Sequence, residues 1–268
     1  MKTAIQSAEV IVDIGGQPIR LCCGDPRFLD MVRQRYAGYV SSTSDAKFEF
    51  EIELAEPNGE SRDEDVQVSW NSGQWHMARG DFRAQFNPAA LRGRIRQTIN
   101  PYSLDSVLRI VHTLLLARQG GFLVHASSAV RNGKAFLFAG ISGAGKTTMA
   151  RLAPADAKLL TDEISYVSFL QDRYIAIGTP FFGELSRVGE NVSAPIACLY
   201  LLAKGDKNTI EDVSGVDAVR GLLENILFFA KEPELVTIVF EAACSFVKRV
   251  PVRRLTFVPD NRVWELIV

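Results

Sequence analysis

The chain has 268 residues, 47% of them hydrophobic and 23% charged, so it is long enough to bury a core without disulfides. A formal net charge of −1 gives no reason to expect a nucleic-acid or membrane partner, and no apolar run approaches the roughly 18 residues of a membrane span. The first residues lack the apolar stretch of a signal peptide and the four cysteines lack metal-ligand spacing, which predicts a cytoplasmic protein.

The first hundred residues predict a β-rich region. Apolar runs over residues 9–14 and 17–22 flank Gly15-Gly16, which indicates a hairpin. Asp25 and Pro26 predict the start of a short helix that ends near residue 36. Alternating apolar residues then predict an antiparallel meander of further strands, over residues 48–54, 66–70, 74–78 and 82–86. Residues 56–65 are its most acidic and loop-like connection.

Arg92, Arg94 and Arg96 repeat at a spacing of two, so the strand that they predict has one positive face. Such a face either binds an acidic substrate segment or forms a solvated sheet edge that discourages aggregation. The sequence favours the edge.

The pattern changes near Asn100, where we place the boundary between a β-rich N-terminal region (1–100) and a catalytic domain (101–268). An apolar stripe predicts a helix over residues 104–115, and short apolar strands then alternate with helices, as in α/β domains. Further strands are expected at residues 122–124, 135–138, 158–161, 164–170, 196–202, 252–257 and 263–268, and further helices at 219–227 and 235–247.

A buried-strand run over residues 135–139 leads into Gly140–Thr147, a complete match to G-x-x-x-x-G-K-[ST]. The glycines let the backbone curl so that N–H groups face phosphate oxygens. Lys146 is expected to reach the β- and γ-phosphates, and the Thr147 hydroxyl to ligate Mg²⁺. The pattern predicts binding of ATP with Mg²⁺, by Gly140, Ser142, Gly143, Ala144, Gly145, Lys146, Thr147 and Thr148.

The next predicted strand ends at Asp162-Glu163. Asp162 is placed to hold Mg²⁺, as a Walker-B aspartate does, and Glu163 is then free to orient or deprotonate a nucleophile. Only one short helix and one strand separate Lys146 from Asp162, so the whole magnesium site is expected in one strand–loop–helix–strand unit. A solvated acidic turn is the alternative.

In this order and at these offsets, His125 at a strand end, the loop 140–147 and the pair Asp162-Glu163 resemble the catalytic domain of HPr kinase/phosphorylase, and more closely its HPr-kinase-like serine kinase relatives. The likeness covers residues 104–181 and weakens toward the C-terminus. It implies an α/β P-loop kinase domain with a mixed sheet, a fold shared with phosphoenolpyruvate carboxykinase.

The resemblance also implies roles. Asp162 corresponds to the first aspartate of the family's acidic pair, and Glu163 stands where the second, catalytic-base aspartate would be, one methylene longer. His125 corresponds to a histidine near the phosphates, with a structural histidine as the alternative. The implied catalytic residues are Glu163, Asp162, Lys146 and His125, with Mg²⁺ at Thr147 and Asp162.

We therefore predict an ATP-dependent kinase that phosphorylates a hydroxyl, by the resemblance a serine, of a protein, peptide or small-molecule acceptor. Residues 1–100 do not resemble the family's N-terminal domain, so the acceptor need not be HPr. Residues 178–184 predict a loop that either closes over the acceptor, with Arg187 neutralising charge, or simply connects two elements. A P-loop ATPase or nucleotide-gated binding module is the alternative function, and a homo-oligomer is left open.

Overall fold

The computed structural model describes residues 8–56 and 64–268, so most of the connection expected at residues 56–65 lies outside the described residues. The chain divides into two compact units. One consists of residues 1–112 and 229–233, and the other of residues 113–228 and 234–268. The division expected after residue 100 remains a prediction. Within the described ranges, none of the helices combines the length and hydropathy that a membrane crossing requires.

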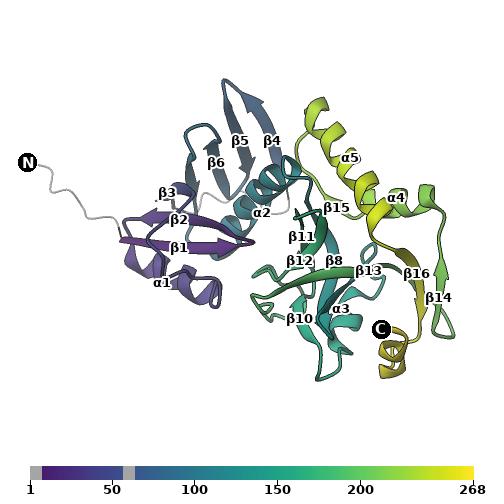
Figure 1. The fold of residues 1–268 in the computed structure, drawn as a ribbon. Helices are drawn as coiled ribbons and strands as arrows, with labels where there is room; N and C mark the ends of the chain where they lie inside the picture. Colours follow the sequence, from purple (N-terminus) through teal and green to yellow (C-terminus); the bar gives the residue numbers. More distant parts are fainter. Residues whose placement is uncertain (1–7, 57–63) are drawn as a thin grey trace, which may run out of the picture. The chain divides into compact units, whose positions relative to one another are not determined.

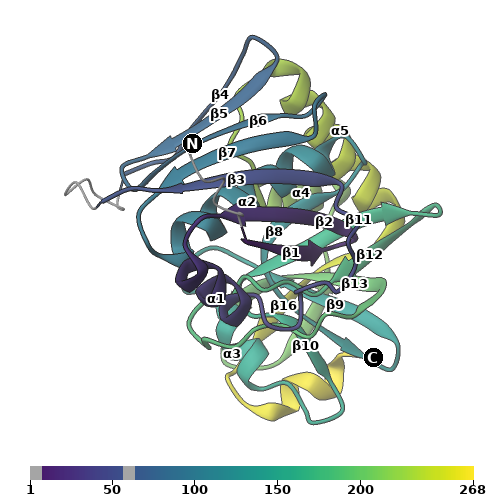
Figure 2. The same ribbon diagram turned by 90° about the vertical axis from the view of Figure 1, so that its left-hand side faces the viewer.

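The first unit contains a seven-stranded sheet whose strands lie in the order β1-β2-β3-β7-β6-β5-β4 (Figures 1 and 2). The strands are β1 (Ala8–Ile14), β2 (Gln17–Cys23), β3 (Phe48–Leu54), β4 (Gln67–Asn71), β5 (Gln74–Arg79), β6 (Phe82–Asn87) and β7 (Arg92–Gln97). β1 and β2 form the predicted hairpin. β3 pairs parallel with both β2 and β7, so the expected antiparallel meander is wrong for β3 and holds only for β4 to β7.

The parallel pairing of β2 and β3 follows from the helix between them. α1 (Pro26–Arg35) begins as predicted at Asp25, whose side chain accepts a hydrogen bond from the amide of Arg27 (2.9 Å). The helix buries Phe28, Leu29 and Val32 and packs against β1 and β2. Because a helical crossover connects them, β2 and β3 can run in the same direction. The short turn of a hairpin would make them antiparallel.

β7 lies inside this sheet, between β3 and β6. At Gly93 a Cβ atom would come within 2.2 Å of the Phe50 ring, so only glycine leaves room for that ring beside the strand. Phe50 stacks on Phe86 with 5.5 Å between ring centroids. The arginine strand is therefore an interior strand over an aromatic core, and the expectation of a sheet edge is wrong.

The second unit contains a nine-stranded mixed sheet, which together with its helices confirms the α/β class with a mixed sheet. β13 pairs parallel with β9 and β16, and β8 pairs antiparallel with its neighbours. The strands are β8 (Phe122–Arg131), β9 (Lys134–Ala139), β10 (Lys158–Thr161), β11 (Ile164–Leu170), β12 (Arg173–Ile177), β13 (Ser193–Lys204), β14 (Thr209–Asp212), β15 (Ile226–Leu227) and β16 (Val252–Phe257).

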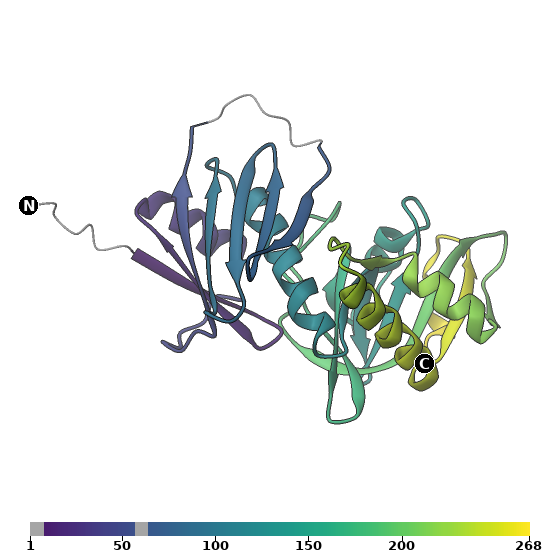
Figure 3. The same ribbon diagram turned by 90° about the horizontal axis from the view of Figure 1, so that it is seen from above.

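Helices cover both faces of this second sheet (Figures 1 and 3). α4 (Gly215–Leu223) and α5 (Pro233–Arg249) pack Leu222 and Phe246 against one face. α3 (Lys146–Arg151) and the 3₁₀ helix η1 (Asn261–Leu266) pack Met149 and Trp264 against the other. α2 (Pro101–Ala117) precedes β8 and extends the helix predicted there by a few residues at each end.

Two predictions near the C-terminus are wrong. The helix expected over residues 219–227 ends at Leu223, because Asn225 turns the chain through a hydrogen bond from its side-chain amide to the carbonyl of Gly221 (2.8 Å). Ile226 and Leu227 then pair with β8 as β15. Residues 263–268 were expected to form a strand, but η1 begins at Asp260, whose carboxylate accepts from the amide of Arg262 (2.9 Å).

Candidate functional site

The glycine-rich loop joins β9 to α3 and is shaped by close contacts at its glycines. Gly145 precedes α3 with a φ of 111°, which residues with a side chain rarely adopt, and a Cβ atom there would lie 2.5 Å from the Phe257 ring. A Cβ atom on Gly140 would lie 2.6 Å from the Cβ of Ala144. The loop therefore depends on glycine at two of the positions where the motif requires it.

Lys146 turns its side chain back toward the loop. Its ammonium donates hydrogen bonds to the carbonyl oxygens of Gly140 (2.7 Å) and Ile141 (3.2 Å). Burial lowers the pKa of Lys146 below its ordinary value, although the nearby carboxylates of Glu163 and Glu184 act in the opposite direction. The cation is thus held at the loop with some of its hydration removed, where an anionic ligand would compensate it.

The acidic pair lies in a tight turn between β10 and β11, and Thr161 builds this turn. The Thr161 hydroxyl accepts hydrogen bonds from the amides of Glu163 and Ile164 (both 3.1 Å) and donates one to the carbonyl of Phe181 (2.9 Å). A serine or threonine hydroxyl commonly caps a turn in this way. Asp162 and Glu163 consequently follow the strand end at the predicted place.

The two acidic side chains have different surroundings. Asp162 is 1% exposed, and its carboxylate accepts hydrogen bonds from the amides of Gly183 and Leu185 (both 2.9 Å). Glu163 is half-buried, and its carbonyl accepts from the amide of Ala126 on β8 (3.1 Å). Sequence reasoning did not foresee the amides on Asp162, because they come from a loop beyond two further strands.

The predicted site residues come together around one cavity of about 530 Å³ in the second unit. The cavity is lined by His125, Gly140, Ile141, Ser142, Gly143, Gly145, Lys146, Thr147, Thr148, Asp162, Glu163, Gly183, Glu184, Glu224 and Asn225. Of the expected residues, Ala144 belongs to the loop but does not line the cavity. His125 is an exposed residue opposite Ile164 of β11, and it lies within β8 instead of at the expected strand end, because β8 continues to Arg131.

Five lining residues were not among the predicted site residues, namely Ile141, Gly183, Glu184, Glu224 and Asn225. Gly183 and Glu184 follow β12 in the loop expected either to close over the acceptor or simply to connect two elements, and this loop borders the cavity. Glu224 and Asn225 follow α4, and the carbonyl of Asn225 accepts from the amide of His125 (2.7 Å). Asn225 is the residue of the sequence that could have indicated the end of this helix. The apolar pattern over residues 219–227 instead predicted that the helix continues through it. Arg187, the expected charge-neutralising residue, does not line the cavity.

The oxygen donors of the cavity fit Mg²⁺. Mg²⁺ in nucleotide sites is usually bound by one or two carboxylates, a hydroxyl, waters and the phosphates themselves. Thr147, Asp162, Glu163 and Glu184 supply such oxygens around Lys146. Among the described residues, no group of three or more His, Cys, Asp or Glu side chains is arranged to hold a metal on its own. The donor set therefore suits a metal that arrives with a polyphosphate.

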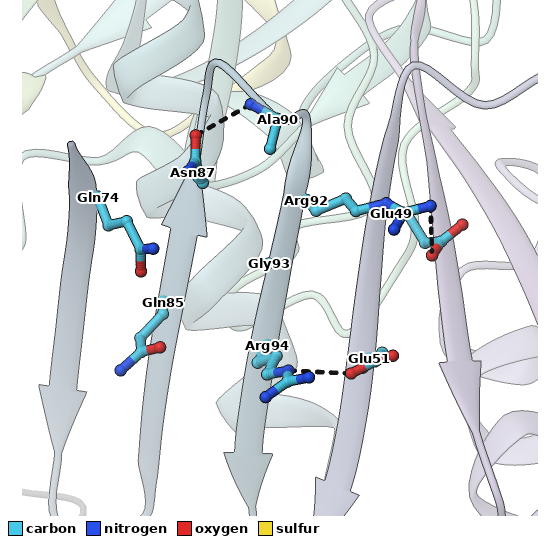
Figure 4. Close-up of a pocket in the computed structure, with 9 residues that line it drawn as sticks. All are labelled: Glu49, Glu51, Gln74, Gln85, Asn87, Ala90, Arg92, Gly93 and Arg94. Carbon is cyan, nitrogen blue, oxygen red and sulfur yellow. Dashed lines mark hydrogen bonds and ion pairs between the residues drawn. The ribbon is translucent and has the colours of Figure 1, made fainter.

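The arginine strand of the first unit lines a separate pocket, of about 330 Å³, with β3 and β6 (Figure 4). Arg94 donates to Glu51 (3.0 Å), and the other two rungs join Arg92 to Glu49 (3.8 Å) and Arg96 to Glu53 (3.3 Å). The parallel register places each arginine opposite a glutamate. Every positive charge of this ladder has a negative neighbour, so the face does not support the alternative considered above, binding of an acidic segment.

Three comparisons with known proteins add to this picture. The family model described as "SynChlorMet cassette protein ScmC" matches residues 91–268. Among solved structures, the chain is similar to the Hpr(Ser) kinase/phosphatase from Coxiella burnetii, at 14% sequence identity and a TM-score of 0.29, over 54% of this chain and 85% of that chain. No curated protein matches the chain. We therefore base the chemistry on the residues that line the cavity.

Proposed function

This chain belongs to the ScmC family of SynChlorMet cassette proteins, and we propose that it is an ATP-dependent kinase that transfers the γ-phosphoryl group to a hydroxyl. One observation carries the proposal. The phosphate-loop motif, all of it except Ala144, lines the same cavity as the Asp162-Glu163 turn and His125, although these come from three separate segments of the chain. A glycine turn without function would have no reason to share a cavity with an acidic pair.

Lys146 and the loop amides bind the β- and γ-phosphates in this proposal. Lys146 exchanges its hydrogen bonds with the carbonyls of Gly140 and Ile141 for bonds to phosphate oxygens. Thr147 and Asp162 would hold Mg²⁺ when the nucleotide complex is bound. When bound, Mg²⁺ neutralises charge that develops on the β- and γ-phosphate oxygens.

Glu163 acts on the acceptor hydroxyl. The bond from the γ-phosphorus to the bridging oxygen of ADP breaks while a bond from the acceptor oxygen to the γ-phosphorus forms. The hydroxyl proton passes to the Glu163 carboxylate, and the leaving oxygen stays on ADP. Glu163 has the exposure to the cavity that this role needs, since it is half-buried and lines the cavity next to Gly183.

The acceptor is proposed to be a protein or peptide serine, or a small molecule that carries a hydroxyl. The family name refers to a cassette, so the other products of that cassette are the first acceptors to test.

Incubation with γ-labelled ATP tests the proposal. A kinase sends the label to an acceptor, whereas an ATPase releases it as free phosphate. The Lys146→Ala variant should transfer no label, because the phosphates lose their only lysine partner in the cavity. The matched control is Lys158→Ala, an exposed lysine on β10 outside the cavity, which should behave as the unaltered chain. Label found only as free phosphate, with every cassette product present, would contradict the kinase assignment.

A further inference from the structure

The loop between β12 and β13 is fastened to the strand that carries the acidic pair. The carbonyl of Phe181 accepts from the Thr161 hydroxyl (2.9 Å), and the amide of Thr179 donates to the carbonyl of Leu160 (3.1 Å). Further along, the amide of Glu190 donates to the carbonyl of Leu159 (2.9 Å). Phe181 is a fully buried residue of this loop. The loop is therefore hydrogen-bonded to three successive residues of β10, which are Leu159, Leu160 and Thr161.

Asp162 supplies the last attachment before the cavity. Its two carboxylate oxygens bind one amide each, that of Gly183 at Oδ1 and that of Leu185 at Oδ2. Hydrogen bonds from amides to a buried carboxylate are among the stronger ones in proteins, because the acceptor is charged. The residue between these two amides is Glu184, so the backbone on both sides of Glu184 is fixed by one side chain.

Gly183 brings the loop close to the acidic pair. A Cβ atom at this position would lie 3.3 Å from the Cβ of Glu163 and 3.5 Å from Oδ2 of Asp162. The absence of a side chain lets the backbone pass directly against Glu163. Glu184 consequently lines the cavity that also contains Lys146, Thr147 and Glu163. Its negative charge acts on Lys146 together with that of Glu163.

We propose that Asp162 is a positioning residue that fixes residues 183–185 and thereby presents Glu184 as a further carboxylate ligand for the metal of the bound nucleotide. The inference rests on the proposed function, since it needs a metal–nucleotide complex in the cavity. In this arrangement Asp162 acts on the metal through Glu184 rather than by a contact of its own, because both of its carboxylate oxygens accept loop amides. Glu184 then joins Glu163 and Glu224 as an exposed or half-buried carboxylate that lines the cavity.

Magnesium-dependent nucleotide binding provides the test, with a fluorescent ATP analogue as the probe. Glu184→Gln keeps the size of the side chain and removes its charge, so it should weaken binding about 10-fold in Mg²⁺ and leave binding in EDTA unchanged. The Mg²⁺ concentration at half-saturation should rise by a similar factor. Glu190→Gln is the matched control, because Glu190 lies in the same loop but does not line the cavity, and its Mg²⁺ midpoint should not move.

The positioning role of Asp162 needs a second variant. Asp162→Asn retains one oxygen acceptor and turns an N–H group toward the other loop amide, so it should release one attachment and raise the Mg²⁺ midpoint in the same direction. If Asp162 acts through Glu184, the two substitutions remove the same interaction. The double variant Asp162→Asn/Glu184→Gln should then bind the nucleotide in Mg²⁺ as tightly as the single variant with the lower affinity. Thermal unfolding of each variant checks that the chain is folded.

The outcomes separate the two proposals. An unaltered chain that binds no nucleotide overturns the proposed function and this inference with it. A chain that binds the nucleotide, while Glu184→Gln keeps a normal Mg²⁺ midpoint, overturns the inference alone. Fold-changes that multiply in the double variant show that Asp162 and Glu184 act independently, which overturns the positioning role.

Discussion

Glu163 and Asp162 are neighbours in the chain, yet their carboxylates have different partners. Asp162 is buried with both oxygens on loop amides, and Glu163 borders the cavity. Two carboxylates in such different environments commonly take different roles. We therefore expect Asp162 to support the structure of the site and Glu163 to contact the substrate.

Glu163→Gln should keep nucleotide affinity and lower the rate of phosphoryl transfer by about 100-fold or more, the range observed when a general base is removed. The substitution leaves the size of the side chain unchanged and the buried Asp162 untouched. Separate measurements of ATP binding and of single-turnover transfer check this. Glu211→Gln on β14, which does not line the cavity, serves as the control. Transfer at the normal rate in Glu163→Gln would exclude the residue from catalysis.

Lys146 predicts a pH dependence of nucleotide binding. Its pKa is lowered in the free protein mainly by burial, and the anionic phosphates favour the charged form, so binding raises that pKa again. Affinity should therefore fall as pH rises through the lowered pKa, below the ordinary value of 10.5, with uptake of a proton on binding in that range. Calorimetry in buffers of different ionisation enthalpy measures both effects. The Lys146→Met variant should bind the nucleotide weakly. It should show neither the pH dependence of affinity nor the proton uptake.

The residues of the phosphate loop and the acidic pair were predictable because each belongs to a local pattern. Gly140–Thr147 is contiguous, and Asp162 directly follows a strand that the apolar run already indicates. The position of Glu184 at the cavity was not predictable, because it depends on amides that come after β11 and β12 in the chain and bind Asp162. A sequence pattern contains no information about such a return of the chain.

At the scale of elements, the apolar patterns predicted most strands and helices. They failed where helix capping, burial or the pairing of distant strands determines the conformation. Residues 263–268 are apolar enough for a strand, but the Asp260 cap and the burial of Val263 and Trp264 on one side favour the 3₁₀ helix η1. The parallel partners of β3 were missed for a different reason. Alternation of apolar residues shows that a strand has one buried face, and it does not show which strand lies beside it.

The 3₁₀ helix η1 supports α3 behind the phosphate loop. Trp264 is buried, packs edge-on against Phe138 of β9, and donates from its indole to the carbonyl of Met149 (3.2 Å). Trp264→Ala should therefore lower the free energy of unfolding by about 3–5 kcal/mol, as large buried aromatic truncations do. Leu266→Ala, at a residue that is 38% exposed in the same helix, should cost less than about 1 kcal/mol. Urea titration compares them. Equal losses would contradict a specific role for Trp264.

At the scale of the whole molecule, every residue that lines the cavity belongs to the second unit. Nucleotide should therefore slow amide hydrogen exchange in residues 140–148 and 183–185, and leave exchange in β4 to β7 of the first unit unchanged. Mass spectrometry of the full chain with and without the Mg²⁺ complex of ATP measures this. Protection that extends into β4 to β7 would show that the first unit also takes part in nucleotide binding.

The glutamate–arginine ladder of the first unit has a consequence for how its sheet aligns. Each rung is exposed and contributes little to stability, but it joins strands far apart in the chain, as Arg94 and Glu51 are separated by 43 positions. A shift of β7 by one residue would turn its three arginines into the aromatic layer of Phe50 and Phe86. A shift by two would leave charges at both ends unmatched. The three arginines thus disfavour a one-residue misalignment of β7 more strongly than their ion pairs stabilise the finished sheet.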